Sequence, residues 1–373
     1  MSIAAPPDVP PDQALILNRS TEALFRSFQL KGLKLRNRIV MAPMTRSHSP
    51  QGVPGADVAA YYRRRAEGEV GLIITEGTYV DHPAAGFDPN VPRFYGPDAL
   101  PGWRYVAEQV HQAGGLIFPQ LWHVGMLVSP QLKPPEEITP IDPHSMTLAD
   151  IDALIEAFAK GARAAKELGF DGVEIHGAHG YLIDQFFWEV TNQRTDQYGG
   201  DLVSRTRFAA EIIQEVRKKV GPDFPVFLRW SQWKLQDFEA KLVRTPHELE
   251  RFLQPLVDAG VDAFHCSTRR FWEPEFAGSD LNLAGWTKKL TGKPAITVGS
   301  VTLNEELMTS FITASTAGVT GIDNLVERLE RDEFDLVAIG RSLIVNPTWP
   351  GIVRRGALQE LRPFNRAVLG ELI

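Results

Sequence analysis

The stretch Val173-Glu174-Ile175-His176-Gly177-Ala178-His179-Gly180-Tyr181 places two imidazoles and a phenol directly after a short apolar run. We interpret the run as a strand whose apolar part ends at Ile175. A strand end that brings two hydrogen-bond donors and a weak acid to one point is suited to bind a polar substrate atom and to protonate its neighbour. The alternative is structural: the histidines are satisfied core groups and Tyr181 lies at a rim. The rest of the chain has to decide between the two interpretations.

Seven other short apolar segments occur along the chain, with helical patterns between them. Alternation of this kind is typical of βα units around a parallel sheet. The nearly continuous apolar character of the segments fits strands that are covered on both sides. The eight predicted strands cover residues 39–44, 70–76, 115–121, 172–176, 225–230, 263–267, 295–299 and 336–340.

Eight βα units predict an α/β fold with a single (β/α)8 TIM barrel. An open dinucleotide-binding sheet is disfavoured because no Gly-x-Gly-x-x-Gly turn follows the first strand. A length of 373 residues also allows two domains, but barrels with insertions often reach it. We predict an N-terminal extension over residues 1–24, poorly ordered at its start, and one barrel domain over residues 25–373.

The clearest helix is predicted over residues 148–168, where apolar positions mark one face. Thr147 and Asp150 form a capping-box pattern at its start, and Gly169 ends it. Further helices are predicted over residues 203–220 and 246–259.

Three other segments are expected outside the barrel wall. Residues 32–38 resemble a hairpin that precedes the first strand and closes the barrel floor. The Pro-rich segment 122–147 and the aromatic-rich segment 268–285 are long enough to form extended loops over the barrel mouth.

Composition restricts the compartment and the class of partner. The net charge of −7 and the pI near 5.8 argue against nucleic acid or an anionic membrane surface as partner. No apolar run reaches membrane-spanning length, and residues 1–13 lack the pattern of a secretion signal. We therefore predict a cytoplasmic monomer or homodimer that acts on small molecules.

The single cysteine, Cys266, excludes an intramolecular disulfide, a multi-cysteine zinc site and a four-thiolate iron–sulfur cluster. It follows an apolar run, so we expect a buried structural thiol, and no metal site is predicted. The arginine run at residues 63–65 is interpreted as the solvated face of a helix.

Glycines and donors follow the last two predicted strands. Gly299 and Ser300 follow the seventh strand, and Gly340 and Arg341 follow the eighth. This is the usual phosphate position of a barrel, where backbone N–H groups and an arginine fork bind an anion. The alternative is an ordinary pair of strand-to-helix glycines, but two such pairs on neighbouring strands favour phosphate.

The other strand ends carry groups that suit a planar ring, which makes flavin mononucleotide (FMN) the natural ligand. Gln120 can pair with a pyrimidine edge, and Arg229 can neutralise the negative charge that develops on a reduced flavin. Arg229 also has a structural alternative, an ion pair inside the barrel with Glu76 or Glu174.

The chain resembles the Old Yellow Enzyme family of FMN-dependent ene reductases from about residue 25 to 365, and its His-His pair resembles the bacterial members. The resemblance rests on the motifs Leu35-Arg36-Asn37-Arg38-Ile39-Val40-Met41-Ala42-Pro43-Met44-Thr45-Arg46, Ile74-Thr75-Glu76-Gly77, Gln120-Leu121-Trp122-His123, His176-Gly177-Ala178-His179-Gly180-Tyr181-Leu182 and Asn192-Gln193-Arg194-Thr195-Asp196-Gln197-Tyr198-Gly199-Gly200. Together these motifs are highly specific.

The resemblance implies a role for each matching residue. Binding of the flavin ring is implied for Ala42, Pro43, Met44, Thr45, Gly77, Gln120 and Arg229, and binding of its phosphate for Gly299, Ser300, Gly340 and Arg341. His176 and His179 would bind the carbonyl or nitro oxygen of the substrate, Tyr181 would donate the proton, and Trp122 would shape the pocket. NADPH or NADH would supply the hydride, and an α,β-unsaturated carbonyl or nitro compound would receive it.

Several residues depart from the family pattern, namely Met126, Trp230 and the segment 186–191, and these departures leave open the substrate preference rather than flavin binding. Reductive cleavage of nitrate esters or reduction of nitroaromatics is a close alternative activity. More distant alternatives are a metal-dependent hydrolase that uses His123, His176 and His179, and a flavin-binding protein without catalysis. Relatives with an added cluster domain are excluded by the single cysteine.

Overall fold

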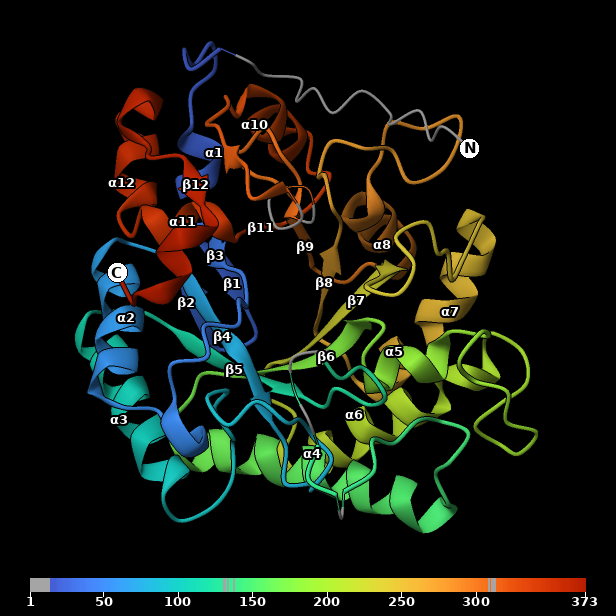
Figure 1. Ribbon diagram of the computed structural model, residues 1–373. Helices are drawn as coiled ribbons and strands as arrows, with labels where there is room; N and C mark the ends of the chain where they lie inside the picture. The colour runs from blue at the N-terminus through green and yellow to red at the C-terminus, as the bar shows by residue number, and fades with distance from the viewer. Residues whose placement is uncertain (1–13, 130–131, 133, 137, 308, 310–312) are drawn as a thin grey trace.

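In the computed structural model, which describes residues 14–373 except 130–131, 133, 137, 308 and 310–312, eight parallel strands close into a barrel surrounded by helices (Figure 1). Neighbouring strands around the barrel follow the order β11-β3-β4-β5-β6-β7-β8-β9, so each strand pairs with the one before it in the chain and the last closes onto the first. Their bounds are β3 (Ile39–Met41), β4 (Leu72–Tyr79), β5 (Ile117–Trp122), β6 (Val173–His179), β7 (Val226–Lys234), β8 (Ala263–Ser267), β9 (Ala295–Val298) and β11 (Leu336–Ile339).

The predicted (β/α)8 barrel and all eight predicted strands are thus confirmed, but three strands, β4, β6 and β7, are longer than expected. The strand that begins at Val173 continues to His179, so His179 lies within β6 together with His176 rather than after the strand. It remains paired because β7 extends alongside it to Lys234, with a register shift between Gly177 and His179. A shift of this kind re-aims the side chains that follow it.

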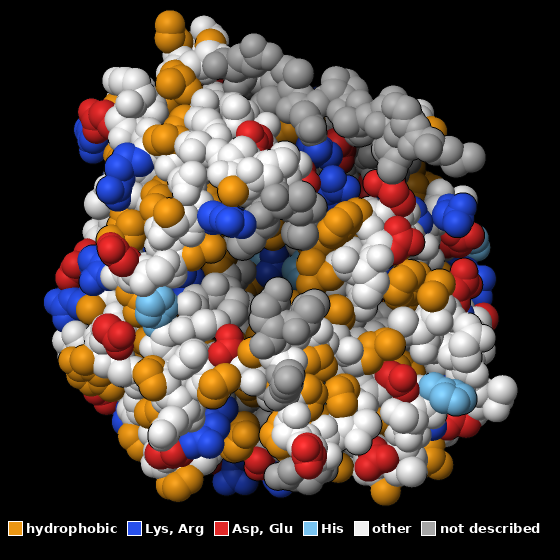
Figure 2. Space-filling model, viewed as in Figure 1, with side chains coloured by type: hydrophobic (Ala, Val, Ile, Leu, Met, Phe, Trp, Pro, Cys, Tyr) orange, Lys and Arg blue, Asp and Glu red, His pale blue; other side chains and the backbone are white. Residues whose placement is uncertain are grey.

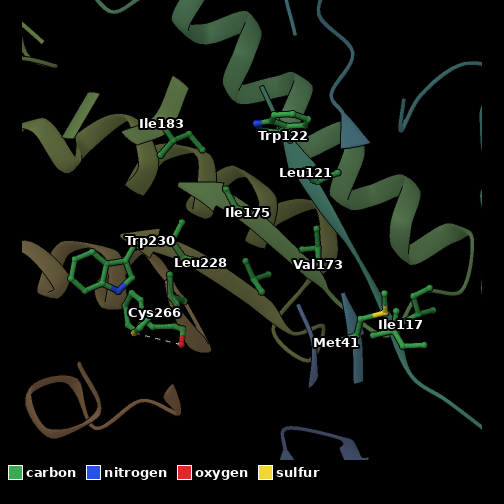
Figure 3. Close-up of a cluster of buried hydrophobic side chains, with 14 of the residues drawn as sticks. Met41, Ile117, Leu121, Trp122, Val173, Ile175, Ile183, Leu228, Trp230 and Cys266 are labelled. Carbon is green, nitrogen blue, oxygen red and sulfur yellow. Dashed lines mark hydrogen bonds between the residues drawn. The ribbon is translucent and has the colours of Figure 1, made fainter. Parts of the chain in front are cut away.

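Alternation along the strands separates the core into two clusters. Ile175 and Leu228 belong to the large cluster between barrel and helices, part of which Figure 3 shows with Trp230 and Cys266. The alternate residues on each strand face the barrel interior. There Phe227 packs against Phe118 in an apolar layer near the lower end of the barrel. Nearer the carboxyl ends of the strands, the inward-facing side chains are polar, and these side chains line the site described below.

The helices that cover the barrel include α2 (Ala56–Glu67), α3 (Ala99–Gln112), α4 (Leu148–Glu167), α6 (Arg207–Val220), α7 (Pro246–Ala259), α8 (Leu283–Thr291) and α10 (Asp323–Glu330). Shorter helices are α1 (Glu22–Phe25), α5 (Leu182–Phe187), α11 (Arg341–Val345) and α12 (Trp349–Arg354), with 3-10 turns at Pro50–Gly52, Ser204–Thr206, Leu358–Glu360 and Arg366–Gly370. The predicted capping box of α4 is present in both directions between Thr147 and Asp150. The helix predicted over 203–220 begins with the turn Ser204–Thr206 and becomes α-helical at Arg207.

A hairpin precedes the first barrel strand and closes the lower end of the barrel, as predicted, but it covers residues 28–35 rather than 32–38. It pairs β1 (Phe28–Leu30) with β2 (Leu33–Leu35). Leu30 and Leu35 are buried in the same cluster as Phe118 and Phe227, so the hairpin completes the apolar lower layer. A second small sheet pairs β10 (Thr316–Ala317) with β12 (Phe364–Asn365).

The arginine run at 63–65 is not a solvated face, contrary to the prediction. Arg65 is fully buried, donates to the carbonyl oxygens of Leu343 and Ile344 at 3.0 and 2.9 Å, and stacks on the ring of Tyr61. The helix pattern did not show this because the acceptors come from α11, far along the chain. Cys266 is buried as expected, and burial raises the pKa of its thiol to about 12.

Of the predicted N-terminal extension, residues 1–13 lie outside the described part. The remainder contacts the barrel, since the backbone N–H of Asn18 donates to Asp323 and α1 packs against α10. The predicted boundary after residue 24 falls inside α1, and the division into domains stays a prediction. Within the described residues, no helix is both long and apolar enough to span a membrane.

Candidate functional site

A cavity of about 440 Å³ opens at the carboxyl ends of the barrel strands, a volume in the usual range for a small-molecule site. Figure 2 shows a hollow near the middle of the face, with basic and histidine side chains in its depth. Every residue predicted for the site lines this cavity: Ala42, Pro43, Met44, Thr45, Gly77, Gln120, Trp122, His176, His179, Tyr181, Arg229, Gly299, Ser300, Gly340 and Arg341. The structure therefore brings the predicted set together, while the role of each residue stays a prediction.

Two histidines and a tyrosine form a compact group on one side of the cavity. The ring centroids of His176 and His179 are 5.1 Å apart, and Tyr181 lies 5.1 Å from His176 and 6.5 Å from His179. His179 has a left-handed backbone (φ 66°), which turns the chain so that Tyr181 stands before the first turn of α5. Trp122 packs edge-to-face on Tyr181 at 4.9 Å and supports the group from β5.

Both imidazoles are neutral near pH 7, because burial and then the charge of Arg229 lower the pKa of His176 and of His179 well below the ordinary value. A neutral imidazole carries one N–H. In His176 the Nδ1 atom accepts the backbone N–H of Ala178 at 3.3 Å, so its proton is on Nε2. Burial raises the pKa of Tyr181 to about 12, so the phenol keeps its proton and is available as an acid.

Below this group a buried network orients the amide of Gln120. Its Nε2 donates to Glu174 Oε1 at 2.7 Å, and the other carboxylate oxygen of Glu174 lies 2.8 Å from His265 Nδ1. Because Nε2 is used in this way, Gln120 offers its carbonyl oxygen to the cavity. That oxygen can accept an N–H from a ligand, as the pyrimidine ring of a flavin provides, and Nε2 keeps a second N–H.

Arg229 is a buried cation that Glu174 attracts at longer range, without a direct ion pair in the described part of the chain. The alternative of an internal ion pair is not found: no carboxylate lies within 4.0 Å of its guanidinium among the described residues. Glu76 instead accepts the backbone N–H groups of Arg46 and Ser47. Burial lowers the pKa of Arg229 to about 10, which leaves it charged at neutral pH. A buried charge of this kind needs an anionic or acceptor ligand, so the pyrimidine edge of FMN fits here.

The opposite end of the cavity carries the predicted phosphate residues. A Cβ added to Gly340 would make only ordinary contacts, 3.6 Å from Met44 and 4.0 Å from Ala42, so Gly340 lies directly beside two other cavity residues. Arg341 is buried there and donates to Ser300 Oγ at 3.3 Å and to the carbonyl oxygens of Glu305 and Glu306. Backbone carbonyls thus occupy part of the arginine fork, and a phosphate would compete with them for its donors.

Several lining residues were not predicted from the sequence. Trp233 and Leu235 come from the part of β7 and its exit that the strand prediction missed, and the ring of Trp233 lies 4.6 Å from that of His179. Ser267 is the last residue of β8, a strand that was predicted from its apolar run without a site residue at its end. Arg269 and Glu306 face one another at 3.3 Å near the phosphate end. The polar residue at each strand end was the signal that could have identified Ser267.

The residues that depart from the family pattern do not line the cavity, and their effect on substrate preference stays open. Trp230 faces the helix layer and packs on Phe252 at a centroid distance of 5.3 Å. Met126 is exposed, and Phe186 and Phe187 belong to the core between barrel and helices. Strand alternation explains Trp230, since Arg229 takes the inward position before it.

The metal-hydrolase alternative has no support in the geometry. His123 turns away from the other two histidines and pairs with His82, with 3.1 Å between Nε2 and Nδ1. Among the described residues, no group of three or more histidine, cysteine, aspartate or glutamate side chains is placed to hold a metal ion.

Comparison with known proteins gives consistent results. Residues 23–360 match the NADH:flavin oxidoreductase / NADH oxidase family. The chain is 34% identical to an NADH oxidase of Thermoanaerobacter brockii over 91% of its length, and 33% identical to a putative 12-oxophytodienoate reductase of Oryza sativa subsp. japonica over 92%. It spans 52% of the former and 88% of the latter, and 59% of 12-oxophytodienoate reductase 7 of Oryza sativa subsp. japonica.

Solved structures show the same fold. Morphinone reductase in complex with tetrahydroNAD superposes with a TM-score of 0.77 at 28% identity, and 94% of each chain is covered. Old Yellow Enzyme from Pichia sp. AKU4542 superposes with a TM-score of 0.76 at 25% identity, over 93% of this chain and 90% of that one.

Proposed function

Because the chain belongs to the NADH:flavin oxidoreductase / NADH oxidase family, we propose that it is an FMN-dependent oxidoreductase that reduces activated C=C bonds at the expense of NADPH or NADH. The acceptors are α,β-unsaturated carbonyl or nitro compounds. The observation that carries the proposal is the grouping of His176, His179 and Tyr181 beside a cavity whose other walls suit a flavin.

The donor set supports FMN as the resident cofactor. Arg229 would hold the pyrimidine carbonyl edge and Gln120 would accept the ring N–H, while Ser300 and Arg341 would hold the phosphate. When bound, FMN would take hydride from the nicotinamide and deliver it to the β carbon of the acceptor. The protein's contribution is placement, charge and exclusion of water.

The remaining chemistry falls to the histidine and tyrosine side chains. The Nε2–H of His176, and an N–H of His179, would donate to the carbonyl or nitro oxygen and so polarise the alkene. Tyr181, protonated because burial raises its pKa to about 12, would donate the proton to the α carbon. The aromatic walls from Trp122 and Trp233 favour flat acceptors.

The biological setting is also part of the proposal. We propose a cytoplasmic protein, monomeric or homodimeric, that binds small molecules and neither nucleic acid nor membrane; the net charge of −7 supports the last two points.

The direct test begins with the purified protein, which is expected to be yellow and to bleach anaerobically when NADPH or NADH is added. Steady-state rates with cyclohexenone, a maleimide, a nitroalkene and a nitrate ester then identify the acceptor class. If only the nitrate ester is turned over, the alternative holds: the protein is a xenobiotic reductase and not an ene reductase. A colourless preparation that does not bind added FMN would refute the proposal.

A further inference from the structure

The hydroxyl of Ser267 joins two parts of the site that lie on different strands. Its Oγ is 2.7 Å from Nε2 of His179, from β6, and accepts from Nη2 of Arg229, from β7, at 3.4 Å. All three side chains are buried. Ser267 itself ends β8, so the contact exists only because β6, β7 and β8 are neighbours in the barrel.

Counting protons decides which way the short contact runs. His179 is neutral and has one N–H to place on either ring nitrogen. The guanidinium of Arg229 can only donate, so the Ser267 oxygen accepts from it and keeps its own hydrogen available. If Nε2 of His179 also donated to Ser267, the buried hydroxyl hydrogen would have no acceptor among the described residues, a cost that buried polar groups normally avoid.

The opposite arrangement leaves only one polar hydrogen of the Ser267–His179 pair without a protein acceptor, and that hydrogen is not on a fully buried atom. Ser267 donates to Nε2 of His179, and the imidazole proton is then on Nδ1. Within the described residues Nδ1 of His179 has no hydrogen-bond partner. It is also not one of the fully buried polar atoms that lack a partner, so it remains accessible. It is therefore the ring nitrogen that remains for a ligand in the cavity that His179 lines.

We infer that Ser267 is a positioning residue that holds His179 in the tautomer with its proton on Nδ1, so that this nitrogen donates to the substrate oxygen. The inference rests on the proposed function, in which both histidines must present an N–H. For His176 the backbone N–H of Ala178 enforces the required tautomer; for His179 the structure assigns that task to Ser267. In the other tautomer a lone pair of His179 would face the lone pairs of the oxygen.

The test combines a spectroscopic and a binding measurement on wild type, Ser267→Ala and Ser267→Thr. Protonated and unprotonated ring nitrogens of a neutral imidazole have well-separated 15N frequencies, so protein labelled with 15N-histidine reports the tautomer directly. The signal of His179 is assigned by its loss in His179→Ala, among nine histidines. Wild type is expected to show His179 protonated on Nδ1, and Ser267→Ala to show a mixture or the Nε2 form.

Binding of a para-substituted phenol to the FMN-loaded protein provides the second measurement. If the Nδ1–H form falls to about one tenth of the population in Ser267→Ala, the apparent Kd rises ~10-fold. Ser267→Thr keeps the hydroxyl and is expected to retain both the wild-type tautomer and the wild-type Kd. Unchanged 15N signals and an unchanged Kd in Ser267→Ala would overturn the inference.

The wild-type spectrum separates this inference from the proposed function. An Nε2-protonated His179 in a wild-type protein that reduces enones overturns the role of Ser267 and leaves the function intact. An Nδ1-protonated His179 in a protein without enone reductase activity upholds the tautomer and refutes the function.

Discussion

Replacement of Lys234 by methionine is expected to destabilise the protein and to loosen the turn that carries Tyr181. Nζ of Lys234 lies 2.7 Å from Asp184 Oδ1, and both side chains are fully buried. The second oxygen of Asp184 accepts the backbone N–H of Gly180 at 2.7 Å, next to Tyr181. The Lys234→Met variant keeps a similar side-chain length but leaves a buried carboxylate without its countercharge.

The structure sets the size and the pH dependence of the effect. Removing one partner of a buried ion pair costs roughly 3–5 kcal/mol. Burial already raises the pKa of Asp184 to about 6 although Lys234 opposes the shift, so without the ammonium the folded pKa rises further. An acid whose pKa is raised on folding binds more protons in the folded state, and the free energy of unfolding falls as pH rises from the unfolded to the folded pKa. Above pH 6, and up to the raised pKa of Asp184, the free energy of unfolding of Lys234→Met should therefore keep falling by about 1.4 kcal/mol per pH unit.

Urea unfolding followed by tryptophan fluorescence from pH 6 to 8 measures this slope. The matched control is Asp184→Asn/Lys234→Met, which removes both charges and keeps an amide oxygen for the Gly180 N–H. It should recover most of the lost stability and lose the extra pH dependence. Equal destabilisation of the single and double variants, with the same pH profile, would refute the reasoning.

Four further variants test the site. Tyr181→Phe should slow cyclohexenone reduction by about 10²–10⁴-fold and leave flavin reduction by NADPH nearly unchanged in stopped-flow experiments; equal losses in both half-reactions would assign the phenol a structural role. Arg229→Leu should weaken FMN retention and shift the flavin reduction potential to more negative values, because the negative charge of the reduced flavin loses its buried countercharge, at a cost of roughly 3–5 kcal/mol. A redox titration without a negative shift would contradict this. His176→Ala and His179→Ala should each weaken binding of a para-substituted phenol by about 1–3 kcal/mol per lost hydrogen bond, seen as loss of the long-wavelength charge-transfer band, and wild-type affinity in both would make the pair structural.

Much of the fold was predictable because its signals are local. Continuous apolar runs of strand length, separated by helices with a capping box such as Thr147 and Asp150, specify βα units without reference to distant residues. The site residues were predictable for a related reason: in a parallel barrel all strand ends meet at one face, so residues at those ends share one cavity wherever they stand in the chain.

Local patterns in the chain were therefore enough to predict the barrel, the face that carries the site and about half of the residues that line it. The contacts between chain-distant groups became known only from the folded chain. They are the burial of Arg65 under carbonyls of α11, the lack of a direct ion pair at Arg229, and the contacts of Asp184 with Lys234 and of Ser267 with His179. Hydrophobic patterns and residue propensities describe neighbours along one strand or helix. These contacts depend instead on the register between strands and on which side chains lie close enough to the same partner to contact it. Charge states and tautomers follow from that placement, because burial and proton counting act on groups only after they have been brought together.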